Sequence, residues 1–159
     1  MSYKLIRIVA MNSILLLFMA TLKGQVGSSI ILIEQPEPLV FSSQRDFVNG
    51  VETCATLAVV NTSNPSSWHL LIKTTGDLEQ AGNSIPISLI EVKANRRRNC
   101  RGRGRSISLS RRNKCIATNR GRSTRIDYVE LTFRAKGGKR FLQPSGRYST
   151  SILFTLVLD

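Results

Sequence analysis

The sequence predicts an all-β fold, an antiparallel β-sandwich of about seven to nine short strands in a single domain. Three observations support this prediction. Short apolar runs are separated by turn residues, two of these runs alternate with a period of two, and no stretch beyond residue 25 keeps a helical period. Antiparallel pairing is expected because no connection offers a crossover helix. The chain has 159 residues, of which 42% are apolar, and this is enough for one hydrophobic core.

The predicted strands are short and lie between turn-rich segments. They are expected at 29–34, 39–41, 50–61, 68–73, 87–93, 126–134 and 148–158. Residues 61–67 and 76–86 are predicted loops, because Asn, Ser, Gly and Pro gather there. Two further runs, 106–110 and 115–118, are predicted to form a hairpin.

The last two strands alternate most clearly. In 126–134, apolar residues at every second position predict one buried face and one wet face. Residues 148–158 also alternate, but Leu153 and Val157 make the second face apolar, so the C-terminal half is expected to be buried on both sides. We expect three strands to supply the main core residues, namely Trp68, Leu70, Val129, Leu131, Phe133, Ile152, Phe154 and Leu156.

The N-terminus resembles a secretory signal. Lys4 and Arg7 precede the apolar run 8–20. This pattern predicts a signal peptide over residues 1–24 and a mature domain over 25–159, outside the cell or at its surface. The run is shorter than the roughly 20 residues that span a membrane. An uncleaved anchor and a buried N-terminal strand or helix are the alternatives.

The net charge of +13 comes almost entirely from one segment. Residues 95–125 contain twelve Lys or Arg and no Asp or Glu, and the rest of the chain carries +1. We expect a basic loop insertion outside a near-neutral sandwich. Guanidinium groups bind phosphate and carboxylate bidentately, so polyanion binding is predicted. The predicted binding residues are Arg96, Arg97, Arg98, Arg101, Arg103, Arg105, Arg111, Arg112 and Lys114.

Three interpretations of this basic segment remain open. As a solvated loop, it would bind surface polyanions such as teichoic acid, acidic polysaccharide, lipopolysaccharide phosphates or extracellular DNA, without specificity and with a steep salt dependence. As a dedicated nucleic-acid site, it would lack stacking partners, because no Phe, Tyr or Trp lies between residues 94 and 126. In the third interpretation the segment is a translation of a shifted reading frame and has no selected function.

Three cysteines are compatible with an exported protein that has at most one disulfide. A Cys100–Cys115 bridge would pin part of the basic segment and leave Cys54 as a buried thiol. Pairing of Cys54 with either of the others, and three unpaired thiols, are equally open. The spacings contain no CxxC pair, so no zinc site is expected.

Nothing in the sequence indicates catalysis. The single histidine, His69, alternates out of phase with its apolar neighbours and is predicted to face away from the core. Asp77 and Glu79 are interpreted as solvating a loop. No metal, nucleophile-elbow or phosphate-cradling motif is present. The chain is therefore predicted not to be an enzyme, and to use no cofactor, no metal and no small-molecule substrate.

Two motifs resemble those of the WxL family of exported surface domains. Trp68-His69-Leu70 supplies a Trp-x-Leu motif within the segment 29–94. Near the C-terminus, a Tyr is followed at the family's spacings by apolar residues, here Tyr148, Ile152, Phe154 and Leu156. The family has Leu and Trp where this chain has Ile152 and Phe154, and the pattern has no counterpart of the basic segment.

The resemblance implies a non-catalytic, structural or adhesive domain at the cell surface that associates with wall polymer and with partner surface proteins. Trp68 itself is also interpreted as a core residue of the sandwich. Residues 142–159 resemble, more weakly, the closing strand of pilin-like and spore-coat-U-like subunits. Those subunits are immunoglobulin-like sandwiches that assemble by strand addition. The two resemblances imply the same immunoglobulin-like architecture and differ in whether the domain self-assembles.

Overall fold

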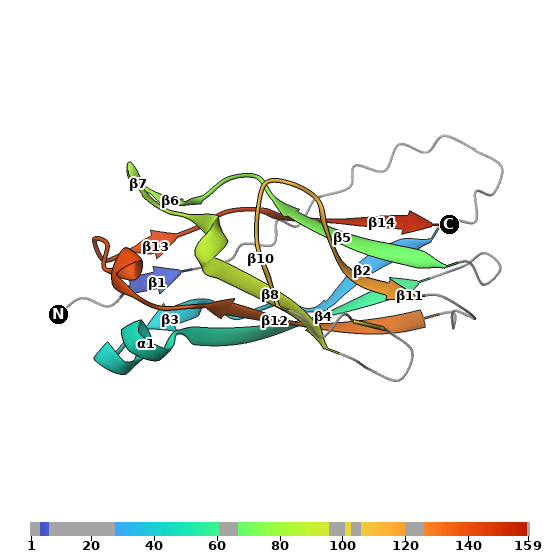
Figure 1. Ribbon diagram of the computed structural model, residues 1–159, viewed down its shortest axis with the longest axis horizontal. Coiled ribbons are helices and arrows are strands. Elements are labelled where there is room, and N and C mark those ends of the chain that lie inside the picture. Colours follow the sequence, from blue (N-terminus) through green and yellow to red (C-terminus); the bar gives the residue numbers. More distant parts are fainter. Residues whose placement is uncertain are drawn as a thin grey trace.

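Figure 1 shows the computed structural model, which is built almost wholly from strands along its long axis. The structure describes residues 4–6, 28–60, 67–95, 101–102, 106–119 and 126–158. These residues form two large antiparallel sheets, with smaller sheets at one end.

The first sheet has five strands in the order β10-β8-β12-β4-β2, and the second has four in the order β14-β5-β11-β9. The strands of the first sheet are β2 (Ser29–Glu34), β4 (Val51–Val60), β8 (Ile90–Asn95), β10 (Ile107–Ser108) and β12 (Ile126–Ala135). Those of the second are β5 (Trp68–Thr74), β9 (Arg101–Gly102), β11 (Lys114–Asn119) and β14 (Ile152–Leu158). The predicted all-β antiparallel sandwich is confirmed; its immunoglobulin-like character remains a prediction.

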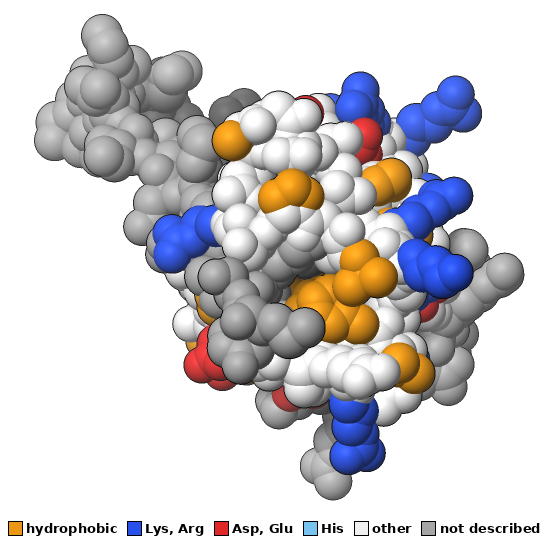
Figure 2. Space-filling model, turned by 90° about the vertical axis from the view of Figure 1, so that its left-hand side faces the viewer, with side chains coloured by type: hydrophobic (Ala, Val, Ile, Leu, Met, Phe, Trp, Pro, Cys, Tyr) orange, Lys and Arg blue, Asp and Glu red, His pale blue; other side chains and the backbone are white. Residues whose placement is uncertain are grey.

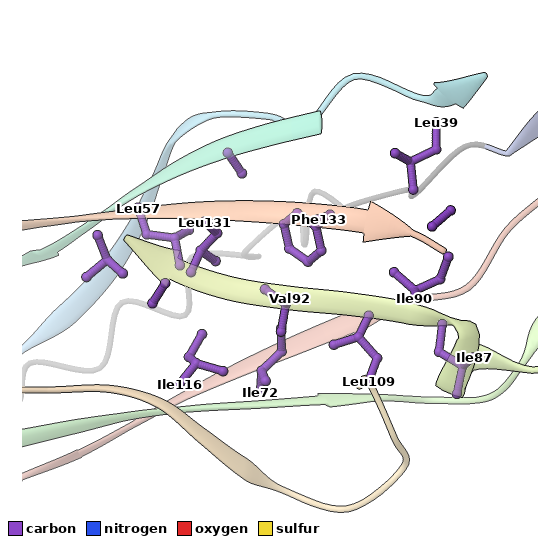
Figure 3. Packing of buried hydrophobic residues seen from close by; sticks show 14 of the residues in the cluster. Leu39, Leu57, Ile72, Ile87, Ile90, Val92, Leu109, Ile116, Leu131 and Phe133 are labelled. Carbon is purple, nitrogen blue, oxygen red and sulfur yellow. The ribbon is translucent and has the colours of Figure 1, made fainter. Parts of the chain in front are cut away.

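The hydrophobic core lies between the two sheets. Figure 3 shows Leu131 and Phe133 of β12 on the same side as Val92 of β8, with Ile72 of β5 and Ile116 of β11 facing them. The predicted core residues on β5 and β12 are at most 1% exposed, as their alternation predicted. Those on β14 are half-buried and pack against the core.

The expectation that the last strand is buried on both faces is wrong. Leu153, Val157 and Leu158 are exposed by 43%, 39% and 43%. Leu153 and Val157 point to the outer face of the second sheet, away from the core. β14 is also an edge strand that, among the described residues, pairs only with β5. The second face is apolar, as the sequence shows, but it is the outer face of the sheet and is exposed.

Two short elements were missed in the predicted loops. Residues 76–86 contain a hairpin of β6 (Leu78–Gln80) and β7 (Asn83–Ile85), closed by Ala81 and Gly82, both at positive φ. The turn has an alanine at a position that usually requires Gly or Asn, so the sequence does not indicate a two-residue hairpin here. The 3₁₀ turn η1 (Ile87–Leu89) follows and moves the start of β8 to Ile90.

The six-residue helix α1 (Gln44–Asn49) was also missed. It is too short to show a helical period, but Ser43 and Asp46 form a capping box at its start. The backbone N–H groups of Ser42 and Ser43 donate to the Asp46 carboxylate at 2.7 and 2.8 Å. These hydrogen bonds lower the pKa of Asp46, the bond from Ser42 most strongly.

A small three-stranded sheet lies at the same end of the molecule. Its order is β13 (Arg147–Tyr148), β1 (Lys4–Ile6) and β3 (Leu39–Phe41), with β1 parallel to β13 and antiparallel to β3. The 3₁₀ turn η2 (Lys139–Phe141) packs Phe141 against Phe41 with ring centroids 4.8 Å apart. The signal peptide predicted over residues 1–24 remains a prediction, because 1–3 and 7–27 lie outside the described residues.

The predicted hairpin of 106–110 with 115–118 is wrong. β10 pairs with β8 of the first sheet, whereas β11 pairs with β5 and β9 of the second. The turn between them therefore crosses from one sheet to the other, and it buries Leu109 at 1% exposure. The basic segment is consequently not a simple loop outside the sandwich, because it also contributes β11 and the buried Ile116 and Ala117.

Candidate functional site

The two family-like motifs are neighbours in space. β5 carries Trp68 and Leu70, and β14 runs antiparallel beside it, so that Leu156 lies opposite Leu70 and Leu158 lies opposite Trp68. Trp68 and Leu70 are fully buried, and Leu156 is half-buried. Apart from Tyr148, which lies in β13 of the small sheet, the motif residues thus form one packed unit of the second sheet rather than an exposed recognition surface.

Trp68 also belongs to a buried polar cluster that joins the two sheets. Its indole Nε1 donates to Asp127 Oδ2 at 2.9 Å, and Asn119 Nδ2 donates to the same oxygen at 3.0 Å. Asn119 and Trp68 are cross-strand partners in the second sheet, whereas Asp127 comes from β12 of the first. All three are at most 6% exposed. A charge-capable acceptor inside the sandwich therefore fixes the indole and ties the sheets together.

Asp127 and Asn119 were not singled out from the sequence. The sequence nevertheless indicates that Asp127 is buried. It alternates in phase with Val129, Leu131 and Phe133 and so lies on the core face of its strand. A carboxylate on such a face requires hydrogen-bond donors. The sequence did not show that these donors would be Trp68 and Asn119, because both lie on the opposite sheet.

Tyr148 opens the second motif and is fully buried, and its hydroxyl donates to the carbonyl of Pro144 at 3.0 Å. This bond to a carbonyl four residues upstream is of the kind found at tyrosine corners of β-sandwiches. Burial raises the pKa of the Tyr148 phenol, since the charged form is poorly solvated there.

We expect Tyr148→Phe to lower the free energy of unfolding by about 1 kcal/mol at pH 7, through loss of one hydrogen bond. The raised pKa adds a pH dependence. The unfolded chain releases the phenolic proton near pH 10, whereas the folded chain retains it, so wild-type stability falls as the pH rises above about 10. Urea unfolding at pH 7 and pH 11 should show a smaller loss between the two in Tyr148→Phe. Equal losses in both proteins would contradict this role.

The described part of the predicted polyanion site lies at one side of the sandwich. Arg101 is in β9, Lys114 opens β11, and Arg111 and Arg112 are exposed in the turn that precedes it. Arg96, Arg97, Arg98, Arg103 and Arg105 lie outside the described residues, so their role remains a prediction.

The turn that carries Arg111 and Arg112 is held to both sheets. The N–H of Leu109 donates to Ile90 in the first sheet at 2.8 Å, and the carbonyl of Ser110 accepts from Thr74 in the second at 2.9 Å. Burial of Leu109 anchors the turn further. The two arginines are therefore presented from a fixed backbone, which lowers the entropy cost of binding a ligand.

The three described side chains of this site are not equally available. Lys114 is half-buried, and its Nζ donates to the carbonyl of Ser108 at 2.7 Å, so it holds β10 in place. Arg111 lies 3.5 Å from Asp77, but both groups are solvent-accessible, so this pair is worth less than about 1 kcal/mol. Within the described part of the chain, Arg112 has no acidic partner. It is the cation most ready to bind a ligand.

A hollow of about 460 Å³ lies beside this turn, between the strands of the two sheets. Its lining includes Glu91, Ser106, Lys114 and Cys115, together with apolar residues of β8 and β11. Glu91 is bonded to Lys136 at 2.9 Å and accepts from Ser106 at 3.3 Å. The carboxylate of Glu91 is thus already paired, so we interpret the hollow as a space for binding a ligand rather than as a reactive site.

The remaining predicted residues have structural surroundings. His69 is half-buried on the outer face of β5, as its alternation predicted. Asp77 does more than solvate a loop, because it accepts from the N–H of Ile87 at 2.9 Å as well as pairing with Arg111. Asp77 and Glu79 line a second, polar hollow of about 450 Å³. Among the described residues, no group of three or more His, Cys, Asp or Glu is placed to hold a metal ion.

The cysteines are only partly described. Cys54 lies exposed on the outer face of β4, so the expectation that it is buried is wrong. Cys54 alternates in phase with Glu52 and Thr56 and therefore lies on the same, outer face of the strand. Cys115 is half-buried, and its thiol donates to the carbonyl of Ala117 at 3.5 Å. Cys100 lies outside the described residues, so the Cys100–Cys115 bridge remains a prediction.

A second basic surface lies at the end formed by α1, β13 and η2. Figure 2 shows apolar side chains gathered on this end, with Lys and Arg around them. Val48 and Leu142 are exposed by 70% and 62%. Arg45 and Arg140 are exposed on the nearby α1 and η2. This end is a separate surface from the turn at residues 109–113.

No family model and no curated protein matches this sequence. The resemblance to the WxL family therefore rests on the two motifs alone. In the described residues, no helix has both the length and the apolar character needed to cross a bilayer.

Proposed function

We propose that this chain is a non-catalytic β-sandwich domain of the cell envelope, structural or adhesive in role, that binds an anionic polymer through its basic side. The observation that supports this most is the rigid turn holding Arg111 and Arg112. It is attached to both sheets and exposed to solvent. In sequence it is flanked by Arg101 of β9 and by eight further arginines, in 96–105 and 120–125, that lie outside the described residues. A rigid cationic edge on a near-neutral sandwich suits a polymer that carries phosphate or carboxylate groups.

The packing of residues 106–119 favours a segment with a selected function over the translation of a shifted reading frame. Leu109, Ile116 and Ala117 pack in the core at 5% exposure or less. β11 also occupies a central position between β5 and β9. An unselected segment would not be expected to supply a central strand with the correct apolar face.

The cell-envelope setting rests on the signal-like N-terminus and on the resemblance to WxL domains. Export would bring the basic side into contact with wall or surface polyanions, and the exposed apolar end near Val48 and Leu142 would be open to partner surface proteins. A nucleic acid presents the same phosphate chemistry, so it serves as a comparison ligand in the test.

The test measures binding of the full chain to purified teichoic acid, and to double-stranded DNA at equal phosphate concentration, over a series of salt concentrations. We expect Arg111→Ser/Arg112→Ser to weaken binding and to lower the slope of log Kd against log salt by about 2, roughly one unit for each contact. The matched control is Arg45→Ser/Arg140→Ser, which removes the same charge from the other end of the molecule. It should leave most of that slope in place.

Three outcomes would overturn the proposal. They are absence of binding to any polyanion, equal effects of the two double variants, and a strong preference for DNA over teichoic acid. The first would favour a segment without function, the second non-specific attraction by net charge, and the third a nucleic-acid-binding protein. Circular dichroism of each variant shows whether the fold is kept.

A further inference from the structure

The free edge of β14 is built differently from the other edges of the two sheets. β14 pairs with β5 over all seven residues, from Ile152 opposite Thr74 to Leu158 opposite Trp68. Its other edge has no partner strand in the described sheet. Alternate N–H and C=O groups along this edge point away from the sheet and are available for pairing with a further strand.

The other edge strands have features that discourage pairing. β2 has a bulge between Leu32 and Glu34 and a charged residue at its end, while β9 and β10 are two residues long. β14 has no charge, no proline and no bulge. Its outward side chains Leu153 and Val157 are exposed by 43% and 39%. A long, uncharged, apolar edge of this kind normally has a partner.

The sequence of β14 is complementary to itself. In an antiparallel pair centred on Thr155, each threonine lies opposite its own copy, and the other positions pair apolar with apolar. These pairs are Phe154 with Leu156, Leu153 with Val157, and Ile152 with Leu158. This register keeps each residue on its own face, so the half-buried row of one copy continues into that of the other, whereas a slip by one residue would not.

The charge distribution allows two copies to meet at this edge. The turn with Arg111 and Arg112 lies near one end of β14, because Ser110 accepts from Thr74 of β5, the residue opposite Ile152. β9, which carries Arg101, is three strands away from β14. At about 4.8 Å per strand this is roughly 14 Å, which exceeds the Debye length of about 8 Å at physiological salt. The exposed Ile31 and Ile33 of β2, at 47% and 57%, lie on the adjacent edge of the first sheet and widen the apolar surface.

We propose that two copies of this chain pair through β14 about a two-fold axis at Thr155, which joins their second sheets into one eight-stranded sheet. The partner is a second copy, because the strand is uncharged and, in the register centred on Thr155, matches itself over all seven residues with both faces preserved. The interface is closed by symmetry, so the product is a dimer and not a polymer. This proposal does not depend on the polyanion site, since no basic residue lies in β14.

The first experiment is sedimentation velocity of the full chain over a wide concentration range. We expect a monomer–dimer equilibrium in the wild type. Thr155→Lys places two like charges opposite each other at the axis and should raise the dimer dissociation constant at least about tenfold. The control Gln44→Lys adds the same charge on the exposed α1 and should leave dimerisation unchanged.

The second experiment tests the register. In a background with the three native cysteines replaced by serine, Thr155→Cys should form a disulfide-linked dimer on mild oxidation, whereas Leu153→Cys, which faces Val157 in this register, should not. A wild type that stays monomeric, open-ended polymers, or equal cross-linking of the two variants would overturn the proposal. Since the side chains of residues 153 and 155 face solvent, both variants are expected to fold, which circular dichroism checks.

Discussion

Replacing Asp127 with alanine is expected to lower the free energy of unfolding by about 2–5 kcal/mol, the largest effect of any single polar substitution in the described residues. The variant removes the acceptor shared by Trp68 Nε1 and Asn119 Nδ2 and leaves both donors buried without it. Each such donor costs about 1–3 kcal/mol. The variant also removes two side-chain hydrogen bonds that join β12 to the second sheet.

Chemical denaturation measures this effect directly. Glu52→Ala is the matched control, because Glu52 is exposed and its ion pair with Arg134 is solvated, so a change within about 0.5 kcal/mol is expected. Asp127→Asn should fall between the two, since the amide keeps one acceptor oxygen but brings its own N–H donors next to those of Trp68 and Asn119. If Asp127→Ala were as stable as Glu52→Ala, the cluster would not tie the sheets together.

Replacing Gly50 with alanine is expected to destabilise the fold by about 3 kcal/mol or more. Gly50 ends α1 with φ +80° and ψ 177°, a conformation that is essentially restricted to glycine and that costs other residues about 1–3 kcal/mol. In addition, a Cβ at this position would overlap the carbonyl oxygen of Ala135 on the neighbouring strand. Relief of that overlap requires movement of β12, which lies in the middle of the first sheet.

A second glycine separates these two causes. Gly82 has a nearly identical φ of +83°, but a Cβ there would meet nothing within 4 Å. Gly82→Ala should therefore cost only the conformational part, about 1 kcal/mol. Thermal and urea unfolding of the two variants give the comparison. Equal losses at both positions would show that close approach of the backbone at Gly50 is unimportant.

Several features of the fold followed from local sequence patterns. The strand 126–135 was predicted within one residue, because a strand with one buried face alternates visibly. The helix α1 and the hairpin of β6 and β7 were missed because six residues do not show a helical period and Ala81-Gly82 is an unusual turn. For the candidate site, the basic residues were evident from composition, whereas the pairing of Arg111 with Asp77 and of Lys114 with Ser108 was not.

The sequence by itself determined the class of fold, the core faces of β5 and β12, and the concentration of positive charge, because each depends on residue type and short-range spacing. Only the tertiary structure decided which strands became edges and which side chains met across the sandwich. β14 has a free edge because no described strand lies beside it, and the Asp127 carboxylate is hydrogen-bonded because Trp68 and Asn119 reach it from the other sheet. Both outcomes depend on contacts between residues far apart in the chain, which local alternation does not encode.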